Sequence, residues 1–313
     1  MKEILVSIIC DVFNHEPYLR QCLDGFVMQI TDFEFEVLIH DDASTDNSVG
    51  IIQEYIDKYP NINWKPIFQQ KNQFSQGVGI WCDIQFPRAN GKYIAICEGD
   101  DYWTDPLKLQ KQVEILESNS LLMGIVTNSS QVDDKGNILL SRYDSIVPKN
   151  TPGQYTLRQF FSYSFTYPTG TIVFRNNHRQ EVIDKFRITK NPYLGDWTLW
   201  IILHTFGDFY YIDDVTAAYR INPTSVTHSK VDERRLGLAK ANFKIIKSVA
   251  SILPEEYADI RDNLLHEKGW LWFNLANAYK HVHKYFLMAG CLLICGILDP
   301  KLLYQKLKGR KNR

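Results

Sequence analysis

The chain has 313 residues, of which 45% are apolar and 23% charged, and its formal net charge is −1 at pH 7. This balance is ordinary for a globular protein. It gives no reason to expect a nucleic-acid-binding protein, which normally has a clear excess of basic residues. The length allows one large domain, or one domain with an appendage. Basic residues crowd only at the end of the chain, where a solvated tail explains them and attraction to an anionic membrane surface is the alternative. They are Lys306, Lys308, Arg310, Lys311 and Arg313.

The cysteines and the apolar segments indicate a protein of a reducing compartment. The six cysteines form no C-x-x-C pair and no zinc-like cluster. After Met1-Lys2-Glu3 the chain enters a strand-like segment without a signal-peptide core. The longest apolar run, 286–298, falls short of the roughly 20 residues that a membrane-spanning helix needs. We therefore expect a cytoplasmic protein, at most peripheral on the inner face of the plasma membrane.

The first third of the chain alternates between strand and helix patterns. Short apolar runs predict strands at 5–10, 35–39, 64–68 and 93–97. Helices are predicted between and after them, because residues that favour helix starts precede apolar positions at helical spacing. These helix patterns begin near Asn14, Ser44 and Asp105. The alternation predicts an α/β fold with a mostly parallel sheet.

Two acidic pairs follow predicted strands. Asp41 and Asp42 come after the second strand, and Asp100 and Asp101 come after the fourth. Both pairs should lie at the ligand-binding edge of the sheet, beyond the carboxyl ends of its strands. Adjacent carboxylates repel unless a cation neutralises them, and Mg²⁺ or Mn²⁺ would suit, with substrate phosphates as further ligands. Spacing alone leaves a metal site and a solvated acidic turn equally open.

Beyond residue 120 the pattern loosens and then becomes helical. A hairpin turn is expected at 133–137, with further strands at 171–174 and 209–212. From about residue 232 the pattern is helical, which places a soft boundary near residue 230. No G-x-G-x-x-G, P-loop or G-x-S-x-G motif is complete, so a dehydrogenase, a P-loop NTPase and a serine hydrolase lack support.

Three segments occur in the order and spacing of a known family. They are Val6-Ser7-Ile8-Ile9 with Asn14, Asp41-Asp42-Ala43-Ser44-Thr45-Asp46-Asn47-Ser48, and Gly91-Lys92-Tyr93-Ile94-Ala95 with Glu98-Gly99-Asp100-Asp101-Tyr102-Trp103. Together they resemble glycosyltransferase family 2, closely over residues 4–117 and loosely to about 230. The resemblance implies a GT-A type fold and an inverting sugar transfer from a nucleotide-sugar, which we expect to be a UDP-sugar. It also implies a catalytic domain over 1–230, with nucleotide-binding (1–117) and acceptor-binding (118–230) halves, before a helical region at 231–313.

The resemblance also assigns roles to single positions. Asp41 matches the carboxylate that binds the nucleotide base, and Asp42 supports its loop. Asp100 matches the residue at the ribose, and Asp101 the carboxylate that holds Mn²⁺ or Mg²⁺ against the diphosphate. Asp196 matches the general base, with a helix cap as its ordinary alternative.

Departures from the family pattern and two weaker candidates complete the predicted site. Asp11 stands where the family usually has Pro, and it adds a charge near the base pocket, so we count it with the nucleotide-binding positions. Ala43 replaces the usual Gly, and Glu98 the usual Asp. Arg220 is a candidate cation for the diphosphate. His228 is a candidate metal or diphosphate ligand, although a lone loop histidine is more often simply exposed.

The implied mechanism is one direct displacement at the anomeric carbon. Asp196 would take the proton from the attacking acceptor hydroxyl. The ion held by Asp101 would neutralise charge on the leaving nucleoside diphosphate. No second carboxylate is a candidate nucleophile for a retaining reaction. The Q-x-x-R-W signature of processive synthases is missing, so we expect one transfer per encounter.

The C-terminal region and the acceptor leave alternatives open. The aromatic-rich segment 270–279 and the apolar run 286–298 either pack on the catalytic domain or lie in a membrane surface. The second arrangement suits a lipid-linked glycan acceptor, as in cell-surface polysaccharide synthesis, and a homodimer also stays open. The rival functions are a nucleotidyltransferase, for which residues 12–15 lack the needed Gly and Lys, and a non-catalytic nucleotide-sugar- or glycan-binding module.

Overall fold

Every strand of the described residues belongs to one sheet, in the first of two units into which the chain divides. The structure is a computed structural model, and it describes residues 3–143, 146–163, 167–189, 195–221, 232–266, 268–301 and 303–304. The first unit comprises Met1–Arg187 and Leu199–Ile221, and the second comprises Ile188–Thr198 and Asn222–Arg313.

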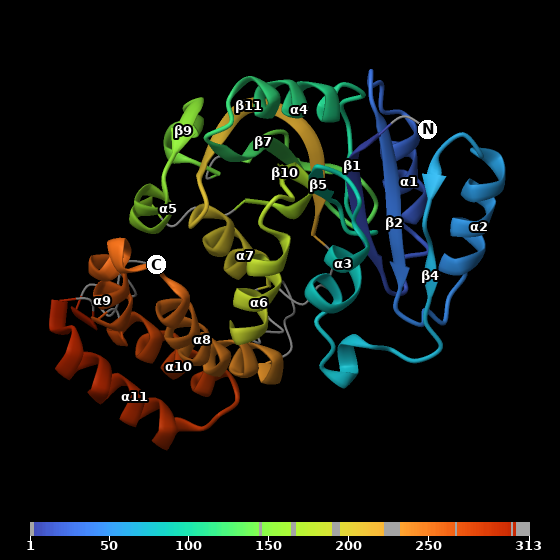
Figure 1. Cartoon of the computed structure of the whole chain (residues 1–313). Helices are drawn as coiled ribbons and strands as arrows, with labels where there is room; N and C mark the ends of the chain where they lie inside the picture. The colour runs from blue at the N-terminus through green and yellow to red at the C-terminus, as the bar shows by residue number, and fades with distance from the viewer. Residues whose placement is uncertain are drawn as a thin grey trace. The chain divides into compact units, whose positions relative to one another are not determined.

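The sheet of the first unit is mixed (Figure 1). Its strands are β1 (Ile4–Val12), β2 (Glu34–Asp41), β3 (Asn63–Trp64), β4 (Ile67–Phe68), β5 (Tyr93–Ile96), β6 (Tyr102–Trp103), β7 (Leu122–Val132), β8 (Ile138–Leu140), β9 (Gly153–Tyr155), β10 (Ile172–Arg175) and β11 (Asp208–Arg220). Their order is β3-β2-β1-β5-β10-β7-β11-β6, with β4 beside β2, β8 beside β7 and β9 beside β11. All pairs from β3 to β5 are parallel, as predicted. β10 runs antiparallel to both β5 and β7 and so interrupts the parallel arrangement, whereas β11 pairs parallel with β7.

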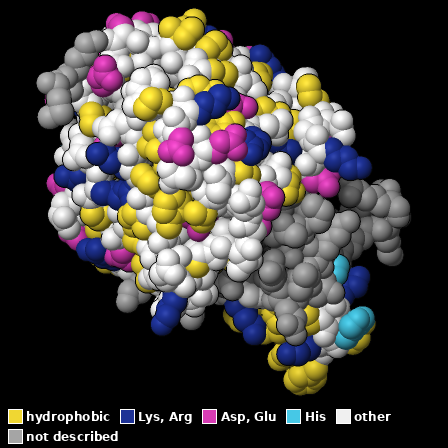
Figure 2. Space-filling view, turned by 90° about the vertical axis from the view of Figure 1, so that its right-hand side faces the viewer, with side chains coloured by type: hydrophobic (Ala, Val, Ile, Leu, Met, Phe, Trp, Pro, Cys, Tyr) yellow, Lys and Arg dark blue, Asp and Glu magenta, His cyan; other side chains and the backbone are white. Residues whose placement is uncertain are grey.

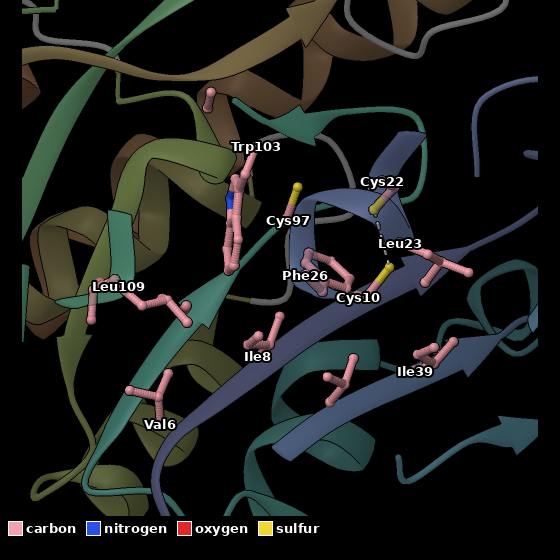
Figure 3. Close-up of a cluster of buried hydrophobic side chains, with 14 of the residues drawn as sticks. Val6, Ile8, Cys10, Cys22, Leu23, Phe26, Ile39, Cys97, Trp103 and Leu109 are labelled. Atoms are coloured by element: carbon pink, nitrogen blue, oxygen red, sulfur yellow. Dashed lines mark hydrogen bonds between the residues drawn. The ribbon is translucent and has the colours of Figure 1, made fainter. Parts of the chain in front are cut away.

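Helices with one apolar face cover one side of this sheet. They are α1 (Leu19–Val27), α2 (Ser48–Lys58) and α4 (Lys108–Ser118). In α1 the buried residues lie three or four positions apart, as an amphipathic helix requires. Leu23 and Phe26 of α1 pack with Ile8 of β1, and Trp103 closes this cluster (Figure 3). The unit also contains α3 (Phe86–Arg88) and α5 (Leu157–Tyr163), whereas α6 (Arg179–Thr189) and α7 (Gly195–His204) each cross a boundary between the units.

Several predicted elements are found with local differences. The predicted strand at 64–68 is two short strands, β3 and β4, because Pro66 between them has no N–H for the ladder. The predicted hairpin is confirmed: β7 and β8 pair antiparallel, and Gly136 in its turn has φ +86°. The first helix begins at Leu19 rather than near Asn14, which instead has φ +56°.

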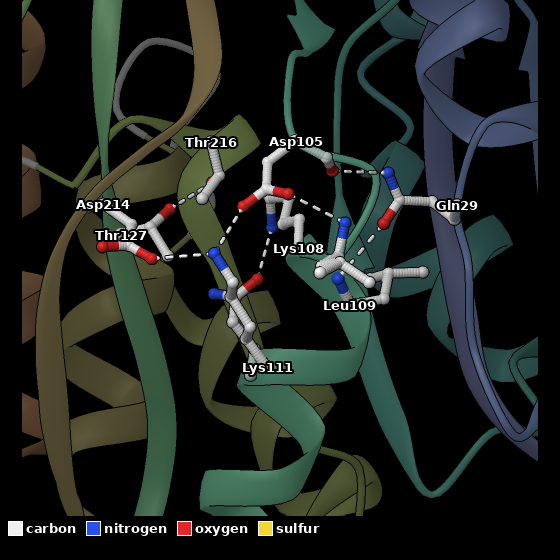
Figure 4. A network of polar contacts seen from close by, with 10 residues as sticks. Gln29, Asp105, Lys108, Leu109, Lys111, Thr127, Asp214 and Thr216 are labelled. Atoms are coloured by element: carbon white, nitrogen blue, oxygen red, sulfur yellow. Dashed lines mark hydrogen bonds and ion pairs between the residues drawn. The ribbon is translucent and has the colours of Figure 1, made fainter.

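The predicted helix is found as α4, which begins at Lys108 with Leu107 rather than Asp105 as its N-cap, and a polar network around Asp105 precedes it (Figure 4). One carboxylate oxygen of Asp105 accepts the backbone N–H of Leu107 at 2.8 Å, which forms an Asx turn just before the helix. The other accepts Lys111 Nζ at 2.8 Å, and Lys111 also reaches Asp214 of β11 at 2.9 Å. This network fixes the segment that follows Asp100 and Asp101 against a distant strand.

The described residues of the second unit are helical, as the sequence predicts. Its helices include α8 (Asp232–Ile252), α9 (Ala258–His266), α10 (Lys268–His281) and α11 (Tyr285–Leu298). Their small core contains Leu236, Ala239, Leu275, Ala276, Ala278 and Cys291. Across the described part of the chain, no helix combines the length and apolar character needed to cross a membrane.

Candidate functional site

The ends of β1, β2 and β5 bring the predicted acidic loops to one edge of the sheet. In the parallel register, Val12 of β1 lies opposite Asp41 of β2. The backbone N–H of Asp42 donates to Val12 O at 2.9 Å, and that of Gly99 donates to Asp11 O at 3.0 Å. The loop after β1 is therefore hydrogen-bonded to both acidic loops, and the predicted convergence of the strand ends is confirmed.

Asp41 keeps one carboxylate oxygen without a partner. The residue is buried, and its Oδ1 accepts the backbone N–H of Ser44 at 3.0 Å. Its Oδ2 is also buried but has no hydrogen bond to any residue that the structure describes. A buried acceptor without a donor is costly, so this oxygen is suited to a ligand that brings an N–H or O–H group.

Ala43 holds the turn between Asp41 and Ser44 in a left-handed conformation, with φ +64°. For a residue with a Cβ, this conformation costs roughly 1–2 kcal/mol of free energy, and for glycine the cost is close to zero. Ala43→Gly is therefore expected to raise the free energy of unfolding by about 0.5–1 kcal/mol, since the greater freedom of glycine in the unfolded chain offsets part of the gain. Urea denaturation of both proteins measures the change, and a lower stability of the glycine variant would contradict this account of the turn.

Asp42 binds the loop at 73–74, whereas the family resemblance implies that it supports the loop of Asp41. Its Oδ1 accepts the backbone N–H of Gln73 at 2.6 Å, and its Oδ2 accepts that of Phe74 at 3.0 Å. Both carboxylate oxygens are thereby used within the protein. This geometry favours a positioning role for Asp42 over direct contact with a nucleotide.

A reciprocal set of hydrogen bonds locks the loop after β1 to the loop after β2. Asn14 Oδ1 accepts the N–H of Thr45 at 2.8 Å, while the N–H of Asn14 donates to Ser44 Oγ at 2.9 Å. The N–H of Glu16 donates to Asp46 Oδ2 at 2.9 Å. The carboxylate of Glu16 in turn accepts the N–H of Asn47, the next residue of that loop, at 2.9 Å. The two loops therefore form one rigid rim beside Asp41.

Asp11 lies next to two polar side chains, Gln85 and His40. Its Oδ1 accepts Gln85 Nε2 at 2.7 Å and lies 4.0 Å from Nδ1 of His40, its parallel partner on β2. Burial raises the pKa of Asp11 to about 6, assisted by the negative charge of Asp42. Among the described residues, the buried atoms Gln85 Oε1 and His40 Nδ1 form no hydrogen bond. Gln85 was not predicted, because nothing near it in the sequence marks a site.

Phe13, which follows β1 directly, is a second residue that the sequence reasoning missed. Its ring is half-exposed at the same edge of the sheet. Bases stack on exposed aromatic rings, so Phe13 is a candidate platform for a nucleotide base. The signal that could have found it is the aromatic side chain next to the first strand end.

Asp101 is a buried carboxylate next to a second one. Its Oδ1 accepts the backbone N–H of Arg220 at 2.7 Å. Burial raises the pKa of Asp101 well above its usual range, and the charge of Asp100 raises it further. A bound divalent cation would offset the free-energy cost of ionising Asp101. Within the described ranges, no three His, Cys, Asp or Glu side chains gather into a ligand set, so Asp100 and Asp101 fit an ion that takes its other ligands from substrate phosphates.

Arg220 ties the end of β11 to the acidic loop. The residue is buried, and its Nε donates to Asp100 O at 2.8 Å. Its remaining nitrogens donate to Asp133 O at 2.9 Å and Gln21 Oε1 at 2.6 Å. The guanidinium also lies 4.6 Å from the ring centre of Tyr18. The predicted nucleotide contact stays a prediction, and the geometry favours a positioning role that fixes Asp100 and Asp101.

Asp196 and His228 complete the predicted residues. Asp196 belongs to the second unit and lies in the first turn of α7, where its Oδ1 accepts the N–H of Trp197 at 2.7 Å. Burial raises the pKa of Asp196. A raised pKa suits a carboxylate that must accept a proton near neutral pH. His228 lies outside the described residues.

Comparisons with solved structures agree with this architecture. The S. aureus TarS 1–349 in complex with UDP-GlcNAc has a TM-score of 0.57 and 18% sequence identity, over 89% of this chain and 82% of that one. A mannosyltransferase, PcManGT from Pyrobaculum calidifontis, in complex with GDP-Man and Mn²⁺, has a TM-score of 0.57 and 14% identity, over 99% of this chain and 80% of that one. These likenesses support the GT-A type α/β fold.

Sequence comparisons identify the family. An uncharacterized protein of Mycobacterium tuberculosis is 32% identical over 232 residues, which is 74% of this chain and 62% of the relative. The poly(ribitol-phosphate) beta-glucosyltransferase of Bacillus spizizenii is 34% identical over 98 residues, 31% of this chain and 15% of that protein. The profile described as Glycosyl transferase family 2 matches residues 7–180, more than half of the chain and including all of the acidic loops. By this match the chain belongs to glycosyl transferase family 2.

Proposed function

We propose that this protein is a metal-dependent, inverting glycosyltransferase that moves a sugar from a UDP-sugar to a glycan or lipid-linked glycan in cell-surface polysaccharide synthesis. The observation that carries the proposal is the buried, unpartnered Oδ2 of Asp41, at the same sheet edge as Asp100 and Asp101. This acceptor matches the ring N–H of uracil, and a carboxylate pair beyond it suits the ribose and a cation. The ligands named for TarS and PcManGT, UDP-GlcNAc and GDP-Man with Mn²⁺, support a nucleotide-sugar donor.

The residues of the chain divide the chemistry between them. Asp101, oriented by the Arg220 N–H, would hold Mn²⁺ or Mg²⁺, which when bound neutralises charge on a leaving diphosphate. Asp100 would bind the ribose, and Asp11 would line the base pocket. Asp196 would accept the proton of the attacking hydroxyl. This assignment needs no covalent intermediate and therefore gives inversion.

We place the enzyme in the cytoplasm, peripheral on the plasma membrane, where lipid-linked acceptors are presented. Charges of both signs are interspersed over the face drawn in Figure 2. With a net charge of −1, this distribution does not favour a nucleic-acid partner.

Asp41→Asn tests the donor site. The asparagine amide can keep the Ser44 bond through its oxygen, but its nitrogen then presents a donor to the ring N–H of uracil. We expect Mn²⁺-dependent affinity for UDP to fall by about tenfold to a hundredfold. CDP, whose ring nitrogen is an acceptor at this place, should lose less or gain. Isothermal titration calorimetry with UDP, CDP, GDP and TDP, each with and without Mn²⁺, measures both effects.

The control for this test is Asp32→Asn, which removes an exposed carboxylate just before β2, at the opposite end of that strand from Asp41. It should bind UDP as the wild type does. Unchanged UDP affinity in Asp41→Asn would place the base elsewhere. Failure of the wild type to bind any of these nucleotides would refute the donor site as a whole.

A further inference from the structure

The helix α11 has two apolar faces, of which only one is packed. Cys291 and Cys295 are buried, and Met288 and Leu292 pack against the core that α10 shares. The opposite face carries exposed residues four, three and four positions apart. They are Phe286, Gly290, Leu293 and Ile297, with exposed fractions of 91% for Phe286, 68% for Leu293 and 71% for Ile297.

This outer face is unlike the outer face of an ordinary surface helix. A helix that covers a core normally turns charged and polar residues towards water. No residue of α11 from Tyr285 to Leu298 is charged. At about 1.5 Å per residue the helix is about 21 Å long, which is shorter than the roughly 30 Å hydrocarbon core of a bilayer. Its length and its packed inner face therefore suit a helix that lies in a membrane surface without crossing it.

Positive charges flank this apolar face at both ends. Lys280 and Lys284 are exposed before the helix, and Lys301 is exposed after it, against a single carboxylate at Asp299. A second copy of the chain paired through the same face would bring lysines against lysines in either orientation. An anionic lipid surface would instead attract both ends while the apolar stripe enters the boundary between headgroups and acyl chains.

We propose that the outer face of α11, formed by Phe286, Leu293 and Ile297, docks the protein onto an anionic membrane surface. This inference deepens the peripheral location proposed above by naming the contacting face and the lipid chemistry. It would place a soluble donor and a lipid-linked acceptor at one surface. Its test uses no nucleotide, so its failure is distinguishable from failure of the proposed sugar transfer.

Vesicle co-flotation of the full chain tests the docking face. The probes are vesicles of phosphatidylcholine alone and vesicles with about one-third phosphatidylglycerol. The wild type should bind the anionic vesicles, and about 0.5 M NaCl should weaken that binding by screening the lysines. The triple variant F286S/L293S/I297S should lose at least about tenfold in partition, because it leaves little apolar surface to insert. Its fold should persist, since the three side chains are exposed.

The matched control is L121S/I138S, which removes exposed apolar side chains from the first unit. It should bind anionic vesicles as the wild type does, and circular dichroism should confirm that both variants are folded. A wild type that does not float with anionic vesicles, or a triple variant that floats equally well, would overturn the inference. Light scattering without vesicles provides a further test. A dimer that the triple variant abolishes would also overturn the inference, because the outer face of α11 would then be a dimer interface.

Discussion

Replacing Asp196 with asparagine is expected to lower kcat for sugar transfer by about 10²–10⁴-fold and to leave nucleotide binding unchanged. The asparagine can still accept the N–H of Trp197, so this contact in the first turn of α7 should persist. What it cannot do is take a proton from an acceptor hydroxyl. These two measurements distinguish a general base from a structural residue. Loss of a general base lowers kcat alone, whereas loss of a structural residue changes both kcat and nucleotide affinity or neither.

The Asp196 measurement needs the donor identified by calorimetry and an acceptor preparation such as an extract of cell-envelope glycolipids. Release of the nucleoside diphosphate then reports turnover, and titration of the nucleotide reports binding. Asp184→Asn, on the exposed side of α6, is the matched control and should retain full turnover. If Asp196→Asn turned over at the wild-type rate, another group would have to be the base.

The pH dependence of turnover provides a second readout for Asp196. Burial raises its pKa above the ordinary value of 3.8. Since the base must be ionised, kcat should fall on the acid side at a pH above that ordinary value. The asparagine variant should lack this acid limb altogether.

The convergence of the acidic loops could be predicted because it depends on local patterns. Apolar runs predict the strands, helical spacing predicts the crossovers, and parallel strands bring their carboxyl ends to one edge. Asp41 and Asp101 needed no further information to be placed together. The same reasoning could not find the partner of Asp101, since Arg220 lies 119 positions beyond it in the chain.

The second half of the sheet was predicted less completely for a physical reason. Beyond α4 the strands are no longer joined by regular crossovers, so their order and direction depend on long-range pairing. The predicted strands near β10 and β11 exist. However, the residues of β10 do not indicate that it pairs antiparallel with both β5 and β7.

Ala43 and α11 also show what local sequence patterns cannot predict. The family resemblance marked Ala43 as a departure, but its cost is visible only in the left-handed backbone of the turn. Likewise, the apolar run at 286–298 predicted a helix that either packs or meets a membrane. The structure shows that within its own unit one face of α11 is packed and the other is exposed, which the apolar run alone does not indicate.

Asp101→Asn is expected to abolish the metal-dependent part of UDP affinity, a loss of about a hundredfold or more, without destabilising the protein. The asparagine oxygen can still accept the Arg220 N–H, but it brings no charge to hold a cation. Asp100→Asn is the matched control. If Asp100 binds the ribose, its loss should weaken UDP binding to a similar degree with and without Mn²⁺.

Stability distinguishes a carboxylate retained for a ligand from one retained for the fold. Burial and Asp100 raise the folded-state pKa of Asp101, so its ionised form costs folding free energy, and this cost grows as the pH rises through that pKa. In metal-free buffer at neutral pH, Asp101→Asn should therefore melt at or above the wild-type temperature. The difference should shrink as the pH falls and Asp101 becomes protonated. A lower melting temperature with intact Mn²⁺-dependent binding would make Asp101 a structural residue, whereas lost binding with retained stability would mean that its buried charge serves the cation.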